Sequence, residues 1–201
     1  NSYVMDNILY KVNFPAEFHA QTAAEAAIKL HPQIAFDDIA HINIHTQEPG
    51  VRIISKQGPL TNYADRDHCI EYIVAWCLLN GNLDANSYTD EAASDSRIDS
   101  LREITSTSEN TEYTNRYYNL DERAIPNKVT VTLKNGDVME EEVIYPLGHR
   151  ERREESKPYL KQKFNNSLEN TGLDQAFLSD AYNSLDLDKV EIYDILKKIY
   201  K

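Results

Sequence analysis

Residues 52–81, RIISKQGPLTNYADRDHCIEYIVAWCLLNG, form the stretch that decides the fold. The second half predicts a helix, which Asn62 or Asp65 would cap at its start and Gly81 would end in the left-handed conformation. Other apolar residues fill most of its remaining faces, so we expect this helix to be buried nearly all round and the domain to pack around it. The apolar positions at helical spacing are Ile70, Ile73, Val74, Cys77 and Leu78.

Cationic and protonatable side chains gather in the first half of the same stretch. Arg52, Lys56, Arg66 and His68 fall in the loop and first turn before the apolar run, where a helix dipole favours anions. In a chain of net charge -12, this grouping suggests a receptor for a carboxylate-rich small molecule. The alternative is that these residues pair with the many acids of the chain, and composition alone leaves both interpretations open.

The flanking segments predict a mixture of helix and strand. An alanine-rich run over about 19–30 favours a helix, and HINIHT at 41–46 alternates as a half-buried strand. VTVTL at 129–133 and the run 138–145 predict a hairpin joined by an Asn-Gly turn. We therefore expect an α+β fold, in which a small mixed or antiparallel sheet has helices packed on one face and a C-terminal helical tail follows.

Other segments carry weaker signals. Glu48-Pro49-Gly50 predicts a turn, and residues 105–124 are polar enough to predict an irregular, mobile loop. Leu160 and Phe164 begin a predicted helix, and residues 172–201 carry two further short helical patterns.

Composition excludes several classes of partner and cofactor. A net charge of -12 argues against nucleic acid and anionic membranes, and no apolar run approaches the roughly 20 residues of a membrane span. The two cysteines, Cys69 and Cys77, are two helical turns apart, too far for a disulfide and too few for an iron–sulfur cluster. With no ligand-spaced set of His, Cys and carboxylates, we expect no metal and no cofactor.

Three histidines lie at the ends of predicted elements, where side chains converge on pockets. His19 enters the first helix, His68 begins the central one, and His149 follows a glycine. Histidine suits proton transfer near neutrality, while Arg and Lys suit carboxylates. The alternative for each histidine is a helix cap or a partner of an acid.

Five ordered motifs carry a resemblance to a known family. The runs SKQGPL, DRDHCIEY and LLNG, with FPAEFHAQTAAEAA at 14–27 and YPLGHRERREESKPYLKQKF at 145–164, resemble the 2-methylcitrate dehydratase branch of the MmgE/PrpD family. The similarity covers most of residues 10–168 and corresponds to the C-terminal part of that family.

The resemblance implies a reaction and its residues. The reaction is elimination of water from 2-methylcitrate to 2-methyl-aconitate in propionate breakdown, without metal or cluster. It implies an active site between two domains, the other being an N-terminal helical domain that is absent here. On this basis His19 and His68 are the predicted catalytic residues. The predicted substrate-binding residues are Gln21, Arg52, Lys56, Arg66 and His149.

The resemblance also divides the chain. Residues 1–13 are expected to be a lead-in from the absent helical domain, 14–148 the small α+β domain, and 149–201 helices that return to the helical domain. The chain starts at NSYVMDNILY without an initiator Met, signal peptide or transit peptide, and we expect it to be a piece of a longer protein.

The expected partners are a tricarboxylate (2-methylcitrate or citrate), the N-terminal helical domain and, as a homodimer, a second copy. The expected location is the mitochondrial matrix for a fungal protein, which the Asn, Ser and Tyr content favours slightly, and the cytoplasm for a bacterial one. Two alternatives stay open: a non-catalytic fragment or polycarboxylate-binding module that is inactive without the N-terminal domain, and a related activity such as cis-aconitate decarboxylase.

Overall fold

A computed structural model describes residues 7–169 and residue 197 of the chain. It contains two compact units, Asn1–Arg153 and Glu154–Lys201. The predicted helix at Leu160 and Phe164 is confirmed as part of α9 (Arg153–Leu168). The two helical patterns expected over 172–201 fall, except for residue 197, outside the described residues. Within the described part, no helix combines the length and the apolar character needed to cross a membrane.

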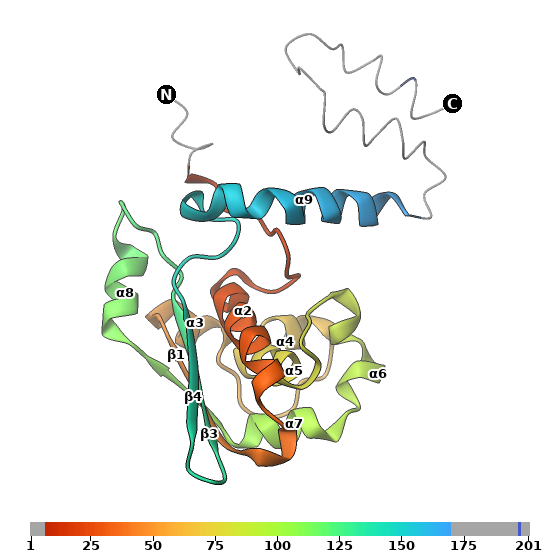
Figure 1. Cartoon of the computed structure of the whole chain (residues 1–201), viewed down its shortest axis with the longest axis vertical. Coiled ribbons are helices and arrows are strands. Elements are labelled where there is room, and N and C mark those ends of the chain that lie inside the picture. Colours follow the sequence, from red (N-terminus) through yellow and green to blue (C-terminus); the bar gives the residue numbers. More distant parts are fainter. Residues whose placement is uncertain (1–6, 170–196, 198–201) are drawn as a thin grey trace. The chain divides into compact units, whose positions relative to one another are not determined.

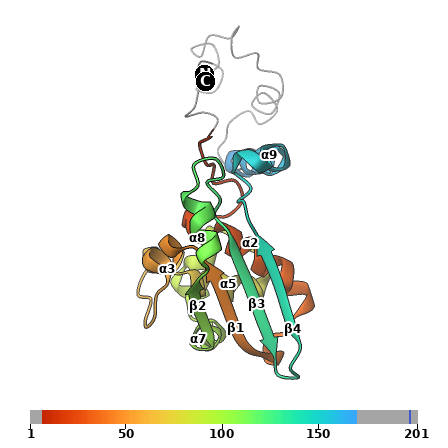
Figure 2. The same ribbon diagram turned by 90° about the vertical axis from the view of Figure 1, so that its left-hand side faces the viewer.

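A four-stranded mixed sheet forms one layer of the first unit (Figures 1 and 2). The strands are β1 (Ile39–Thr46), β2 (Thr105–Glu109), β3 (Asn127–Leu133) and β4 (Val138–Val143), in the order β2-β1-β3-β4. β1 pairs parallel with β2, whereas β3 pairs antiparallel with both β1 and β4. The predicted strands and their hairpin are confirmed, and the fold is α+β as expected.

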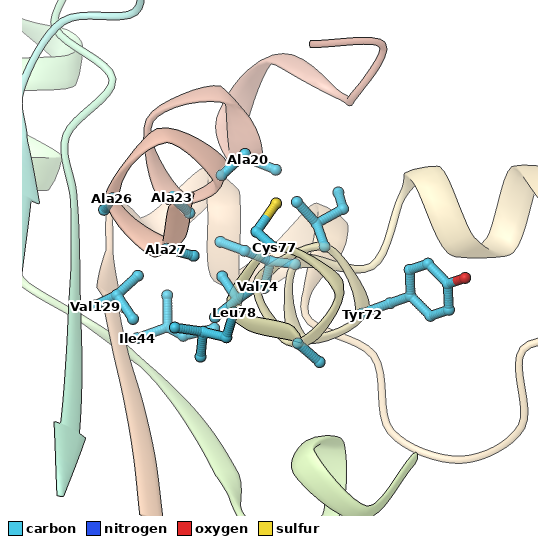
Figure 3. Close-up of a cluster of buried hydrophobic side chains, with 14 of the residues drawn as sticks. Ala20, Ala23, Ala26, Ala27, Ile44, Tyr72, Val74, Cys77, Leu78 and Val129 are labelled. Carbon is cyan, nitrogen blue, oxygen red and sulfur yellow. The ribbon is translucent and has the colours of Figure 1, made fainter. Parts of the chain in front are cut away.

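Helices α2 (Gln21–Leu30) and α5 (Ile70–Asn80) supply most of the buried face that covers the sheet. Figure 3 shows Ala23 and Ala27 of α2 on the side toward Val74, Cys77 and Leu78 of α5, with Ile44 and Val129 of the sheet completing the cluster. Small alanine side chains let α2 and α5 approach each other closely, so the core between these helices is well packed. α5 is buried almost all round, as its sequence predicts.

The predicted central helix is divided into two. Asn62 caps a separate short helix, α4 (Tyr63–Asp67), by accepting a hydrogen bond from the Asp65 N–H. His68 and the extended Cys69 break the chain before α5 begins at Ile70. Gly81, with φ 67°, ends α5 as predicted. His68 therefore lies between two helices and not in the first turn of a long one.

Two segments are more regular than the sequence suggests. The predicted turn at Glu48-Pro49-Gly50 is the start of helix α3 (Glu48–Ile54), because proline is tolerated in a first helical turn. The predicted mobile loop over 105–124 contains the edge strand β2 and helix α8 (Thr111–Tyr118), which Asn110 caps. The remaining elements are η1 (Phe18–Ala20), η2 (His31–Gln33), η3 (Phe36–Asp38), η4 (Ala85–Tyr88), α6 (Asp90–Ala93), α7 (Ser96–Glu103) and η5 (Arg150–Arg152).

The parallel pairing of β1 and β2 brings α3 and α8 to the same end of the sheet. Each helix follows one of these strands directly, and parallel strands end at a common edge. The Asn110 N–H donates to the Thr46 carbonyl at 2.8 Å, and the Glu48 N–H donates to the Thr114 hydroxyl at 2.9 Å. Because η1 also contacts α3, this end of the sheet gathers three helix termini.

The segments before α2 and after β4 run side by side. The Tyr10 N–H donates to the Gly148 carbonyl at 3.3 Å, and a Cβ at position 148 would overlap the carbonyl of Tyr10. Arg152 forms a bidentate pair with Glu25 of α2, with distances of 2.8 and 2.9 Å. These contacts fix the course of both segments on the domain.

Candidate functional site

His19 is held on both ring nitrogens at the turn into α2. Its Nδ1 lies 2.8 and 2.9 Å from the two carboxylate oxygens of Glu17, and its Nε2 lies 3.2 Å from the Tyr117 hydroxyl. Glu17 also caps η1, accepting the His19 N–H at 2.7 Å. Because an ionised carboxylate only accepts, Nδ1 carries a hydrogen, and the neutral ring presents Nε2 as its basic atom.

The Glu17 carboxyl is ionised in spite of its surroundings. Its burial alone would raise its pKa, but the hydrogen bonds from His19, together with the charge of the ring when it is protonated, outweigh that effect and hold the pKa below its usual value. Both side chains are mostly shielded from water. A carboxylate and an imidazole in this arrangement resemble the base and orienting acid found in many enzymes.

A second group of polar side chains adjoins this pair from α3 and α8. Arg52 Nε lies 2.6 Å from Glu48 Oε1, and the Tyr118 hydroxyl donates to Glu48 Oε2 at 3.3 Å. The hydrogen bond from Arg52 lowers the pKa of Glu48, to which His19 also contributes. Arg52 Nη2 also donates to Glu48 Oε2 at 3.5 Å, but 62% of the Arg52 side chain is exposed, so the guanidinium is accessible to an anion.

Tyr117 connects the two groups. Burial is the main cause that raises its pKa, with Tyr118 and Glu17 adding to it and Arg52 opposing it. The ring lies 5.5 Å from that of His19, centroid to centroid. The phenol is therefore neutral and can donate a hydrogen bond to Nε2 of His19.

The second predicted catalytic histidine lies on an adjoining turn. The Glu17 N–H donates to the Asp67 carbonyl at 3.3 Å, which ties the turn of His19 to the turn of His68. His68 Nδ1 lies 2.6 Å from the Asp67 carboxylate, and 47% of the His68 side chain is exposed. The structure thus brings the His19 and His68 turns together and leaves the His68 ring accessible.

Other predicted substrate-binding residues already have protein partners. Arg66 is only 5% exposed and donates to the Tyr88 carbonyl at 2.7 Å. Its Nη2 lies 2.7 Å from Asp90, while its Nε has no hydrogen-bond partner among the described residues. Buried Gln21 donates to two carbonyls of the loop before it, at 2.9 and 2.7 Å. Both side chains hold the backbone around the histidine turns.

Lys56 lies near the same loop but is only loosely paired. Its Nζ is 3.8 Å from Asp65, and its backbone N–H donates to buried Glu71 at 3.1 Å. The four cationic groups expected to crowd together are thus divided. Lys56 precedes α4, Arg66 lies within it and His68 follows it, whereas Arg52 lies on α3 beside Glu48.

His149 is buried and fully hydrogen-bonded. Its Nδ1 accepts the Glu151 N–H at 3.2 Å, so its Nε2 carries the hydrogen and donates to the Glu122 carbonyl at 3.0 Å. Burial lowers its pKa, and its ring stacks on Tyr145 at 4.6 Å. A neutral ring with both nitrogens occupied is suited to shaping a pocket.

A cleft of about 260 Å³ lies next to His149 and Tyr117, both of which line it. Other residues on its wall are Tyr118, Arg123, Ile125 and Arg150.

Sequence reasoning missed Glu17, Tyr117 and Arg123 as functional candidates. Glu17 was detectable, since a carboxylate two residues before a histidine can reach its ring. Tyr117 was not, because only the course of β2 and α8 brings it to His19.

Metal-binding groupings are not found in the described part of the chain. No group of three or more His, Cys, Asp or Glu side chains there is placed to hold an ion. Cys69 and Cys77 are buried and unpaired with each other. Burial, followed by the charge of Glu71, raises the pKa of the Cys69 thiol to about 11, so it is not a reactive thiolate near neutral pH.

Comparison with known proteins gives one family match and several similar sequences. The model of the MmgE/PrpD C-terminal domain matches residues 14–182. The mitochondrial 2-methylcitrate dehydratase of Yarrowia lipolytica is 55% identical over 81% of this chain and 32% of its own length. The probable 2-methylcitrate dehydratase of Saccharomyces cerevisiae is 49% identical over 84% of this chain and 34% of its own, and the Escherichia coli K12 enzyme is 47% identical over 83% and 36%. The chain thus spans about a third of the length of these relatives.

Proposed function

Because this chain belongs to the MmgE/PrpD C-terminal domain family, we propose that it is the C-terminal part of a 2-methylcitrate dehydratase. The activity is that of a hydro-lyase, which removes water from 2-methylcitrate to form 2-methyl-aconitate. One observation carries the assignment of the site: His19 is fixed by Glu17 on Nδ1 and presents Nε2 toward Tyr117.

His19 is proposed as the base of the elimination. A proton on a carbon next to a carboxylate is weakly acidic, and Nε2 is the ring atom available to take it. The electrons of that C–H bond form the new double bond while the C–O bond of the hydroxyl breaks. The substrate takes the place of the Tyr117 hydroxyl, whose present contact with Nε2 at 3.2 Å marks the direction of approach.

The departing hydroxyl needs a proton to leave as water, and His68 is the proposed donor. Asp67, 2.6 Å from Nδ1, orients the ring, and its exposure leaves the ring accessible to substrate. Arg52 and Lys56 are the proposed carboxylate ligands on this chain, since neither is buried. For Gln21, Arg66 and His149, whose polar atoms already hold the backbone, we propose a contribution to substrate binding through the shape of the site.

No metal ion or cluster takes part in the proposed reaction. The chain has only two cysteines, and both are buried thiols rather than thiolates open to a cluster. The remaining donors near the site are occupied as an imidazole–carboxylate pair and an arginine–carboxylate pair. Stabilisation of charge on the substrate is therefore assigned to arginine, lysine and hydrogen-bond donors.

The whole reaction is proposed to need more than this chain. The relatives are about three times as long as the matched part, and we propose that an N-terminal helical domain completes the site. We further propose a mitochondrial location, following the Yarrowia relative, whose name places that protein in mitochondria. Assembly as a homodimer is a separate proposal.

Activity of a joined protein tests the function. The joined protein consists of the N-terminal part of the Yarrowia relative followed by this chain, and formation of 2-methyl-aconitate is followed by absorbance. We expect turnover by the joined protein and none by the chain alone. A folded joined protein that binds 2-methylcitrate without dehydrating it would favour a non-catalytic binding module. Release of CO₂ from cis-aconitate would favour the decarboxylase alternative.

A further inference from the structure

The cleft beside Tyr117 has an unusual charge for this protein. Two of the described residues that line it are arginines, Arg123 and Arg150, and none is an aspartate or glutamate. The whole chain has 33 acidic and 21 basic residues, so two arginines and no acids among the described lining residues are a local reversal of its charge. Such a cleft attracts anions in an otherwise repulsive field.

The guanidinium of Arg150 belongs to the wall of the cleft. Its Nη1 donates to the Asn7 side chain at 2.8 Å, and Asn7 is also a lining residue. Among the described residues it pairs with the carboxylate of Glu151, which is about half exposed and lies 3.5 Å from Nε. Such a loose surface pair is weak, so the charge of Arg150 is available to a ligand.

Arg123 has an unusual backbone. Its φ of 48° is the only positive value for a residue other than glycine within the described residues. This backbone conformation is strained for an arginine, and such strained positions concentrate at functional sites. The turn holds it through the Arg123 N–H, which donates to the Asn119 carbonyl at 2.7 Å.

A second cleft of similar size provides a contrast. It measures about 280 Å³ and is lined by residues that include Arg102, Asp99 and Glu103. There, Arg102 lies 2.7 Å from Asp99 and is neutralised by it. Carboxylates in the lining of a cleft repel a bound anion, whereas the described residues that line the cleft near Tyr117 include no carboxylate.

The apolar part of the lining narrows the class of anion. Leu9, Leu120 and Ile125 form part of the wall along with two tyrosine rings. Inorganic phosphate would gain nothing from these surfaces, whereas a carboxylate carried on a short hydrocarbon would contact them. The volume of about 260 Å³ lies just below the usual range for drug-sized ligands, so it suits one arm of a small polycarboxylate.

We propose that this cleft is a carboxylate subsite in which Arg123 and Arg150 bind one arm of the substrate next to His19. The link to the reaction is Tyr117, which lines the cleft and contacts Nε2 of His19. An arm held here places the adjoining carbon beside the imidazole. This assignment rests on the proposed function for the identity of the substrate, but binding of the carboxylate itself does not require turnover.

Titration of the 201-residue chain with tricarballylate tests the subsite. Tricarballylate is a tricarboxylate without a hydroxyl, so it cannot be dehydrated, and its dissociation constant is measured by calorimetry. We expect Arg123→Gln and Arg150→Gln each to weaken binding at least about tenfold, the lower end for a hydrogen bond to a charged group. The control Arg97→Gln removes an exposed arginine paired with Asp95 and should leave binding unchanged.

Further variants separate loss of charge from loss of structure. Arg150→Lys keeps a positive charge at this position, so it should bind tricarballylate more tightly than Arg150→Gln. The Ile125 methyl signals should shift on titration of the wild-type chain. Unchanged binding in both arginine variants, or phosphate binding as tightly as tricarballylate, would overturn the subsite. Binding as expected with an inactive joined protein would reject the dehydratase proposal alone.

Discussion

The Glu17 carboxylate contacts His19 at two points: it accepts the backbone N–H at 2.7 Å, and it lies 2.8 Å from Nδ1 of the ring. Two residues of separation in the sequence thus suffice to fix both the backbone turn and the orientation of the imidazole. The side chain of Tyr117 meets the opposite nitrogen from a distant helix. The ring is held before any substrate arrives, as accurate proton transfer requires.

Replacing this carboxylate should lower turnover without abolishing binding. In the joined protein, Glu17→Gln should reduce kcat at least about tenfold, because small errors of orientation are costly in proton transfer, and change KM little. The control Glu140→Gln removes an exposed acid of β4 that pairs with Lys128 and should have no effect. A raised KM with normal kcat in Glu17→Gln would contradict a positioning role for Glu17.

His68 should behave as a catalytic residue with little structural importance. His68→Ala in the joined protein should lower kcat by roughly 100-fold, the usual effect of a lost proton-transfer group. The melting temperature should stay the same, since nearly half of the side chain is exposed. Kinetics and melting are measured on the same preparation, and a normal kcat with a lowered melting temperature would remove His68 from the mechanism.

Arg66 should matter mainly for stability. Arg66→Ala leaves the Tyr88 carbonyl without its donor and should lower the free energy of unfolding by about 1–3 kcal/mol. Asp90→Asn removes only an exposed partner and should cost less than about 1 kcal/mol. Urea unfolding of the two variants measures both values. An Arg66→Ala variant with wild-type stability and a raised KM would instead make Arg66 a direct substrate ligand.

Much of the fold was readable from the sequence because its core signals are local. The apolar surface of α5, the alanines of α2 and the Asn135-Gly136 hairpin each specify their element through nearby residues. α3 and β2 were missed for physical reasons. Pro49 reads as a turn but also suits a first helical turn, and TSTSE becomes a strand only by pairing with β1.

The site was less predictable because its contacts join distant segments. His19, His68 and Arg52 stood out by residue type, yet nothing in the sequence reveals that Tyr117 reaches the ring of His19, 98 residues away. The burial of Arg66 was also hidden, because the carbonyl that holds it belongs to Tyr88 in a later turn. Spacing predicts local geometry, whereas the partner of a long side chain depends on tertiary packing.

The free energy of unfolding should decrease as the pH is lowered, because His149 is then forced to take up a proton. Burial keeps its folded-state pKa below the usual value near 6.5, so below that pH the unfolded chain binds more protons than the folded one. The free energy of unfolding should therefore decrease from about pH 6.5 downward until the folded-state pKa is passed. Urea unfolding at a series of pH values should show this slope in the wild type and a smaller one in His149→Gln. An identical slope in both proteins would assign it to another group.

Gly148, in the segment that follows β4, should not tolerate a side chain. A Cβ there would overlap the Tyr10 carbonyl, and backbone atoms cannot move aside as a flexible side chain can. We expect Gly148→Ala to lower the free energy of unfolding by about 1–3 kcal/mol, the usual cost of forced overlap in a packed region.

Gly58→Ala is the matched control, because nothing lies within 4 Å of its added Cβ and only its φ of 83° disfavours alanine. That strain alone costs about 1 kcal/mol. Thermal and urea unfolding of both variants measure these losses of stability. If Gly148→Ala costs no more than Gly58→Ala, the two neighbouring segments are less tightly joined than the Tyr10–Gly148 contact implies.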